Sequence, residues 1–156
     1  MKLSEVLTES AVLLDLQGRD KWHLIELLTD ALVGSGQINS GRRDTVLEAL
    51  VVRERSMSTG MENGIAIPHT SVPEVEKTAI ALGISRSGVD FEAIDGGQTH
   101  LVILLVNPSN RTKAHIRTLA EIARLLSSAE LRQALQDAPS AGVALDRIRE
   151  AEAAVT

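Results

Sequence analysis

The chain contains no cysteine and almost no aromatic residues, and each absence excludes a kind of chemistry. Among its 156 residues there is no cysteine, so disulfides, thiolate nucleophiles, iron–sulfur clusters and cysteine zinc sites are excluded. Tyrosine is absent as well, and Trp22 and Phe91 are the only tryptophan and phenylalanine. Base-stacking platforms and aromatic sugar cradles are hard to build from so few rings. Histidine, carboxylate or hydroxyl groups must therefore carry any chemistry.

An excess of basic charge and a long apolar run are also missing. Sixteen Lys and Arg against 21 Asp and Glu give a net charge of -5, so we expect no nucleic-acid partner. The longest apolar run, 101–106, is too short to span a bilayer, and the amino terminus does not read as a secretory signal. We therefore expect a cytoplasmic protein without direct membrane insertion. The length predicts a single domain over 1–156, with an ordered core at about 3–150.

Hydrophobic periodicity predicts helices alternating with short strands. Strands are expected at 12–16, 65–67, 78–84 and 101–106, and the last should be buried on both faces because it is continuously apolar. Helices are expected at 20–33, 42–55, from 112 onward, 129–136 and 141–153. In the third of these, Thr112 is the expected N-cap and the apolar residues are Ile116, Leu119, Ala120, Ala123 and Leu126. This order indicates an α/β fold with helices around one sheet.

The common catalytic and nucleotide-binding motifs do not occur. Gly34-Ser35-Gly36 lacks the third glycine of a dinucleotide loop, and there is neither a Gly-Lys-Ser/Thr sequence nor a Gly-x-Ser-x-Gly elbow. His23 and Glu26 lie on adjacent helical turns, but without a third ligand they favour a solvated helix face over a zinc site. We therefore expect no cofactor and no metal.

Three side chains remain as candidates for phosphoryl chemistry. His69 follows Pro68 at the end of a predicted strand, where a neutral imidazole could attack phosphorus without a general base. His115 lies in the first turn of a predicted helix, where the backbone amides favour an anion. Arg53 ends a predicted helix, and its guanidinium could hold phosphoryl oxygens. For each there is a plain structural alternative: a capping or surface imidazole, an exposed first-turn residue, and an ordinary helix-end arginine.

The run from Arg53 to His69, RERSMSTGMENGIAIPH, resembles the active-site signature of one protein family. That family is the fructose/mannitol-type (type 2) enzyme IIA of the bacterial phosphotransferase system, which includes nitrogen-regulatory relatives. The resemblance continues through FEAID at 91–95, the apolar run 101–106 and KAHI at 113–116, and so covers nearly the whole chain. It implies a mixed sheet sandwiched between helices.

The resemblance also implies a function, partners and site residues. The family's phosphoryl-accepting histidine matches His69, its accessory histidine matches His115, and its phosphate-stabilising arginine matches Arg53. The implied donor is HPr or an HPr-like carrier of the nitrogen branch, and the implied acceptor is enzyme IIB. Many members have glycine after the active histidine, whereas this chain has Thr70 and Ser71. We expect an isolated domain without a carrier or membrane domain, and on that expectation we favour the nitrogen-regulatory branch over a sugar-specific one.

Two other hypotheses compete with a phosphocarrier. The first is a regulatory module that docks on target proteins without passing a phosphoryl group onward. The second is a metal site made by His69 and His115, which would retain metal on purification.

Overall fold

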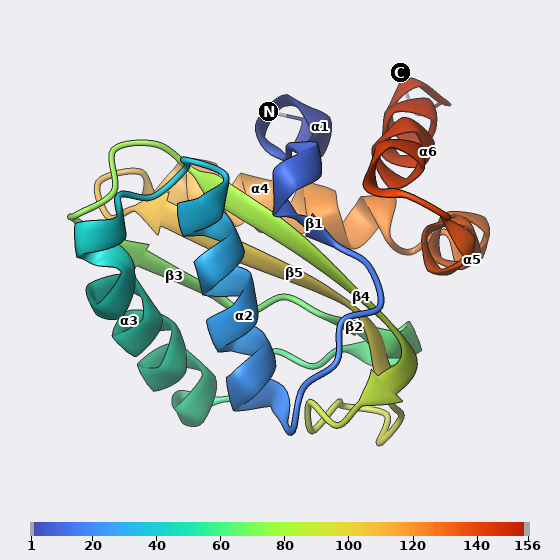
Figure 1. Cartoon of the computed structure of the whole chain (residues 1–156), viewed down its shortest axis with the longest axis horizontal. Helices are drawn as coiled ribbons and strands as arrows, with labels where there is room; N and C mark the ends of the chain where they lie inside the picture. The colour runs from blue at the N-terminus through green and yellow to red at the C-terminus, as the bar shows by residue number, and fades with distance from the viewer. Residues whose placement is uncertain (1, 155–156) are drawn as a thin grey trace.

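The computed structural model describes residues 2–154, which form a five-stranded mixed sheet with helices on both faces (Figure 1). The strands are β1 (Val12–Leu13), β2 (Ile65–Ala66), β3 (His69–Val72), β4 (Ala79–Val89) and β5 (Thr99–Pro108). The α-helices are α1 (Leu3–Val6), α2 (Lys21–Gly34), α3 (Arg43–Ser56), α4 (Thr112–Leu125), α5 (Ala129–Asp137) and α6 (Ala141–Ala154). Three short 3-10 turns, η1 (Glu9–Ala11), η2 (Ser40–Arg42) and η3 (Glu62–Gly64), complete the chain. The α/β class and the mixed sheet are confirmed.

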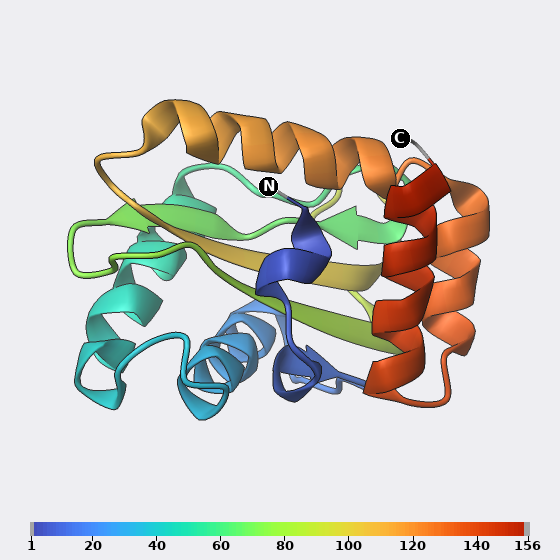
Figure 2. The ribbon, with the colours of Figure 1, turned by 90° about the horizontal axis from the view of Figure 1, so that it is seen from above.

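The helices divide into layers around the sheet. Helices α2 and α3 cover one face and α4 runs along the other, as the view from above shows (Figure 2). Helices α5 and α6 pack together at one end of the sheet, and α1 contacts α6. The sandwich therefore has α2 and α3 on one face and α4 on the other, and α1, α5 and α6 also contact the strands.

Strand β5 is the centre of the sheet. It pairs antiparallel with β4 on one side and parallel with both β2 and β3 on the other, while β1 adds to the far side of β4. Every residue from Leu101 to Val106 is buried, as its continuous apolar run predicted. Burying a Leu, Ile or Val side chain contributes about 1.5–3 kcal/mol, so this strand anchors the fold.

Pro68 divides the predicted strand at 65–67 from the residue that follows it. Proline has no N–H to donate, so the ladder with β5 is interrupted at 67–68. The Pro68 carbonyl still accepts from the Leu105 amide at 3.0 Å, and pairing resumes with His69 opposite Leu105. His69 therefore opens a second short strand, β3, and does not simply follow the end of the first.

Other predicted boundaries were wrong in instructive ways. The strand expected at 12–16 ends at Leu13, because Asp15 adopts a positive φ of 52° and its carboxylate bonds Arg86. The strand expected at 78–84 continues to Val89 through an irregularity in its pairing with β5. Helix α4 begins at Thr112 with Arg111 as N-cap and no side-chain cap, so Thr112 is not the cap.

The apolar residues of α4 do not all face the sheet. Ile116 is 61% exposed, whereas the polar residues His115 and Thr118 are buried with Ile122 on the inner side. The side of α4 that the apolar residues predicted to be buried is therefore rotated about the helix axis from the side that is buried in the structure. This rotation brings His115 inward, toward β3, and leaves Ile116 outside.

Candidate functional site

His69 is held by a short hydrogen bond on one side of its ring. Its Nδ1 lies 2.7 Å from the Ile67 carbonyl oxygen, which can only accept, so Nδ1 carries the proton. The second ring nitrogen, Nε2, therefore presents a lone pair. The ring bonds back onto the backbone two residues before it, which fixes its direction without another side chain.

His115 lies beside His69, although the two residues belong to different segments of the chain, α4 and β3. The two ring centroids are 5.4 Å apart and the planes are inclined by 49°. His115 is buried, and its Nδ1 has no hydrogen-bond partner within the described chain. An exposed first-turn residue, the plain alternative for His115, is therefore ruled out. His115 is instead a buried residue whose ring lies beside that of His69.

The surroundings keep both imidazoles neutral. Burial lowers the pKa of His69 below its ordinary value of 6.5. The hydrogen bond to Ile67 raises this pKa and the positive charge of Arg53 lowers it, and the net shift is downward. Burial also lowers the pKa of His115, with a smaller contribution from His69. At neutral pH, Nε2 of His69 is thus an unprotonated nucleophile.

Arg53 comes to the same place from the end of α3. One of its terminal nitrogens donates to the Met57 carbonyl at 2.8 Å, so the side chain is folded toward the loop that follows the helix. Arg53 and His69 both line a surface hollow of about 360 Å³. The remaining donors of the guanidinium can reach a group held in that hollow.

A buried carboxylate that the sequence analysis missed organises the loop between Arg53 and His69. Glu54 is buried, and its carboxylate accepts from the Thr59 amide at 2.9 Å and from the Thr59 hydroxyl at 2.6 Å. The Lys21 ammonium, also buried, lies 3.2 Å from Glu54 and 3.2 Å from the exposed carboxylate of Glu92. Lys21 thus ties the start of α2 to the end of α3 and to the loop before β5.

The loop also contacts the segment 91–95 very closely. The Ser58 hydroxyl donates to the Phe91 carbonyl, and the Gly60 carbonyl accepts from the Ile94 amide at 3.3 Å. A Cβ at Gly60 would lie 2.7 Å from the Phe91 carbonyl oxygen, so only glycine fits there. The FEAID segment therefore forms the outer wall of the loop that follows α3.

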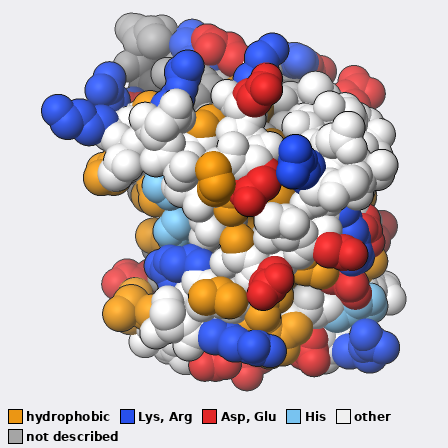
Figure 3. All heavy atoms as spheres, turned by 90° about the vertical axis from the view of Figure 1, so that its left-hand side faces the viewer, with side chains coloured by type: hydrophobic (Ala, Val, Ile, Leu, Met, Phe, Trp, Pro, Cys, Tyr) orange, Lys and Arg blue, Asp and Glu red, His pale blue; other side chains and the backbone are white. Residues whose placement is uncertain are grey.

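The hollow has an apolar lining around its polar groups. Besides His69 and Arg53 it is lined by the loop 58–61 and by Ile67, Ile94, Leu119, Ala120 and Ala123. Figure 3 shows histidine side chains together in a hollow of the surface, with hydrophobic and Lys or Arg side chains around them. The imidazole of His69 and the guanidinium of Arg53 thus open onto one solvent-facing cavity, and the buried ring of His115 lies directly beside His69. This arrangement is suited to a phosphoryl group.

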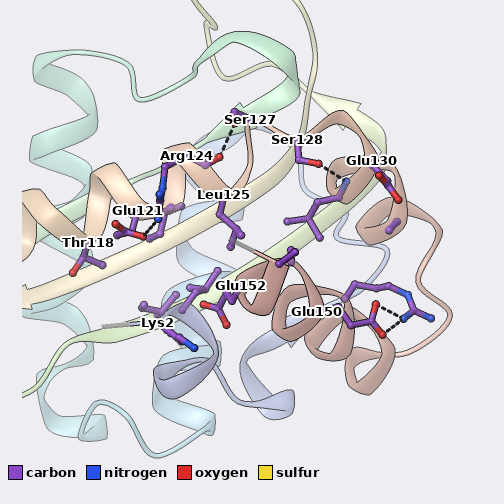
Figure 4. Close-up of a pocket in the computed structure, with 18 residues that line it drawn as sticks. Lys2, Thr118, Glu121, Arg124, Leu125, Ser127, Ser128, Glu130, Glu150 and Glu152 are labelled. Atoms are coloured by element: carbon purple, nitrogen blue, oxygen red, sulfur yellow. Dashed lines mark hydrogen bonds and ion pairs between the residues drawn. The ribbon is translucent and has the colours of Figure 1, made fainter. Parts of the chain in front are cut away.

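A larger cavity of about 600 Å³ lies on the opposite flank of α4 (Figure 4). It is lined by α1, α4, α5 and α6 and contains none of the three candidate residues. Its charged groups largely satisfy one another, since Arg124 pairs with Glu121 and Arg147 with Glu150. It offers no nucleophile comparable to His69.

Residues 2–154 contain neither a cluster of metal ligands nor a helix that could span a membrane. No group of three or more His, Cys, Asp or Glu side chains is placed to hold a metal ion. None of the helices in that part of the chain has the length and apolar character needed to cross a membrane.

Solved structures resemble this fold over most of the chain. The nitrogen regulatory protein IIA-Ntr from Neisseria meningitidis matches with a TM-score of 0.85 and 29% identity, covering 94% of this chain and 98% of that one. The mannitol IIA protein from Escherichia coli matches with a TM-score of 0.77 and 22% identity, over 90% of this chain and 97% of that one. The second likeness shows the fold alone.

Sequence relatives agree with the structural likeness. A fructose-specific EIIABC component of Bacillus subtilis is 34% identical over 96% of this chain, which spans 23% of that protein. A nitrogen regulatory protein of Pseudomonas aeruginosa is 32% identical, covering 90% of each chain. Residues 5–151 match the family described as phosphoenolpyruvate-dependent sugar phosphotransferase system, EIIA 2. The chain therefore belongs to this type 2 enzyme IIA family of the phosphotransferase system.

Proposed function

We propose that His69 is the phosphoryl acceptor and donor of this enzyme IIA, and that Arg53 and His115 stabilise the transferred group. The observation that carries the proposal is the bond from Nδ1 of His69 to the Ile67 carbonyl. It leaves Nε2 unprotonated beside His115 and the hollow that Arg53 lines.

The transfer is an in-line displacement at phosphorus. The Nε2 lone pair of His69 forms a bond to the phosphorus of a phosphohistidine donor while the donor's own N–P bond breaks. The donor imidazole leaves with that electron pair, and the positive charge moves to the ring of His69. The proton stays on Nδ1, and its hydrogen bond to the Ile67 carbonyl stabilises the positive charge of the ring. Arg53 and His115 offset the charge on the phosphoryl oxygens, and no proton has to be removed by a general base.

The proposed donor is HPr or an HPr-like carrier, and the phosphoryl group is either passed to enzyme IIB or kept on the protein as a regulatory state. One structural neighbour is a complex of the Escherichia coli mannitol enzyme IIA with phosphorylated enzyme IIB, which supports docking of that kind on this fold. A cytoplasmic location belongs to the same proposal and rests on the sequence alone.

We place the chain in the nitrogen-regulatory branch, where the phosphorylated and free forms would act as regulatory states. A relative named nitrogen regulatory protein matches along 90% of both chains, and the IIA-Ntr structure has a higher TM-score than the mannitol protein. Regulatory docking on target proteins is a second function of the same surface. Transfer from the phosphorylated protein to the host's enzyme IIB domains would instead assign a sugar-specific role.

Intact-protein mass spectrometry tests the carrier role. The protein is incubated with phosphoenolpyruvate, enzyme I and HPr, as wild type and as His69→Ala, His115→Ala and Arg53→Lys. We expect a single phosphoryl adduct that is lost in His69→Ala and forms more slowly in the other two. His23→Ala, which removes a histidine of α2, is the matched control and should behave as wild type. An adduct that survives in His69→Ala would refute the assignment.

A further inference from the structure

Exposed hydrophobic side chains gather around the histidine hollow. In the described part of the chain, the large hydrophobic residues left exposed are Val52 (59%), Met57 (70%), Ile94 (79%) and Ile116 (61%). Ile94 lines the hollow, Ile116 follows His115 on α4, and the Met57 carbonyl holds Arg53. Apolar groups concentrated on one face in this way mark a contact surface for another protein.

The outer side of α4, next to this apolar group, is basic. Lys113 and Arg117 lie two positions before and after the buried His115, so at about 100° per residue both point away from the sheet. Both are exposed, as is Arg111 directly before the helix. From residue 96 to 120 the chain carries these three cations and no carboxylate, although its net charge is -5. The overall composition hides this local excess.

These cations are free to meet a partner. None of the three forms an ion pair within residues 2–154, whereas five other arginines each pair with a carboxylate: Arg43, Arg86, Arg124, Arg147 and Arg149. A rim of unpaired positive charge beside exposed apolar side chains is complementary to an apolar patch with a negative rim.

The carboxylates on the other side of the hollow are mostly engaged. Asp95 accepts from the amides of Asn63 and Gly97, which lower the pKa of this exposed carboxyl and keep it ionised. Glu92 pairs with Lys21. Glu62 is the exposed carboxylate of the 58–64 loop without such a bond. The unpaired positive charge of this face therefore lies along its α4 edge.

We infer that the partner protein docking on this face carries carboxylates at the rim of an apolar patch, opposite Lys113 and Arg117. The inference rests on the proposed phosphoryl transfer at His69 and specifies the chemistry of the partner. The cations on α4 accelerate encounter and select the partner, while Arg53 and the two histidines perform the transfer. Such rim charges act chiefly on the association rate. Their effect weakens as salt is added, because the Debye length shortens from about 30 Å at 0.01 M to about 8 Å at 0.15 M ionic strength.

A charge-swap experiment tests the inference. An HPr-type carrier is prepared in two forms, with either three Glu or three Lys substituted at the rim of its docking face. Transfer of the phosphoryl group to this protein is then followed at several donor concentrations and salt concentrations. The test variant is Lys113→Glu/Arg117→Glu. The matched control is Arg42→Glu/Arg149→Glu, which makes the same charge change at exposed positions on η2 and α6.

We expect the Glu form of the carrier to have a kcat/KM about tenfold above the Lys form at low salt. The preference should reverse in the α4 variant, persist in the control and shrink as salt rises, with the maximal rate little changed. Equal rates for both forms, or faster transfer from the Lys form to the wild type, would overturn the inference. So would binding to phosphatidylserine vesicles that the α4 variant alone loses without any change in transfer. Absence of transfer from both forms at saturation would instead refute the proposed function.

Discussion

Replacing Glu54 with alanine should destabilise the protein by about 3–5 kcal/mol, although Glu54 is not proposed to touch a phosphoryl group. The substitution removes two hydrogen bonds to Thr59 and one of the two partners of the buried Lys21 ammonium. The remaining partner, Glu92, has a side chain that is 69% exposed and offers weaker compensation. For a chain of this size each kcal/mol shifts Tm by about 2–4 °C, so Tm should fall by about 6–20 °C.

Two further variants separate charge from shape. Glu54→Gln keeps the shape of the side chain and can retain hydrogen bonds to Thr59, so it should cost less than alanine. Adding Lys21→Met removes the buried cation that Glu54→Gln leaves uncompensated. The double variant should therefore be more stable than the sum of the single effects predicts, because residues in one buried network are coupled.

Urea denaturation followed by the fluorescence of Trp22 measures these effects. The Lys21 ammonium nitrogen lies 4.9 Å from the ring centroid of this single tryptophan, and the guanidinium carbon of Arg55 lies 5.8 Å from it. Trp22 therefore reports on the same junction. A loss below about 1 kcal/mol for Glu54→Ala, or strict additivity of the double variant, would refute the assigned role of the network.

Three other predictions concern separate parts of the structure. Gly60→Ala should cost about 1–3 kcal/mol because its Cβ meets backbone atoms of 91–93, while Gly34→Ala, with nothing within 4 Å, should be neutral or stabilising; urea midpoints compare them. Leu104→Ala, in the buried centre of β5, should cost about 2–5 kcal/mol by the same assay, and an effect near zero would contradict the packing. Because folding lowers the pKa values of His69 and His115, these two groups bind more protons in the unfolded chain than in the folded one near pH 6.5. Their contribution to the free energy of unfolding is therefore fully present above that pH and is lost as the pH falls below it. Replacing both with Gln should flatten Tm between pH 7 and 5, and an unchanged slope would refute the burial argument.

Sequence patterns predicted what depends on local hydrophobicity. The continuous apolar run 101–106 identified the central strand, and the helices near 20–33, 42–55, 129–136 and 141–153 were found within about two residues at each end. The orientation of α4 could not be read in this way. Its inner side carries His115 and Thr118, which are polar, so hydrophobic spacing alone pointed to the exposed side with Ile116.

The candidate site was predicted by residue type and resemblance, but its supporting contacts were not. The proximity of His69 and His115 depends on the pairing of β3 with β5 and on the course of α4, which are non-local. Glu54 could have been noticed as a carboxylate inside the signature run, next to Arg53. Its partner Lys21, however, is 33 positions away, and no local pattern links the two residues.

The position of the phosphoryl group on the ring of His69 tests the central claim most directly. The protein is phosphorylated through phosphoenolpyruvate, enzyme I and HPr, and the N–P linkage is identified by phosphorus and nitrogen NMR in alkaline buffer. Since Nδ1 is bound to the Ile67 carbonyl, the account predicts a phosphoryl group on Nε2 of His69. A phosphoryl group on Nδ1 of His69, or on either nitrogen of His115, would contradict it.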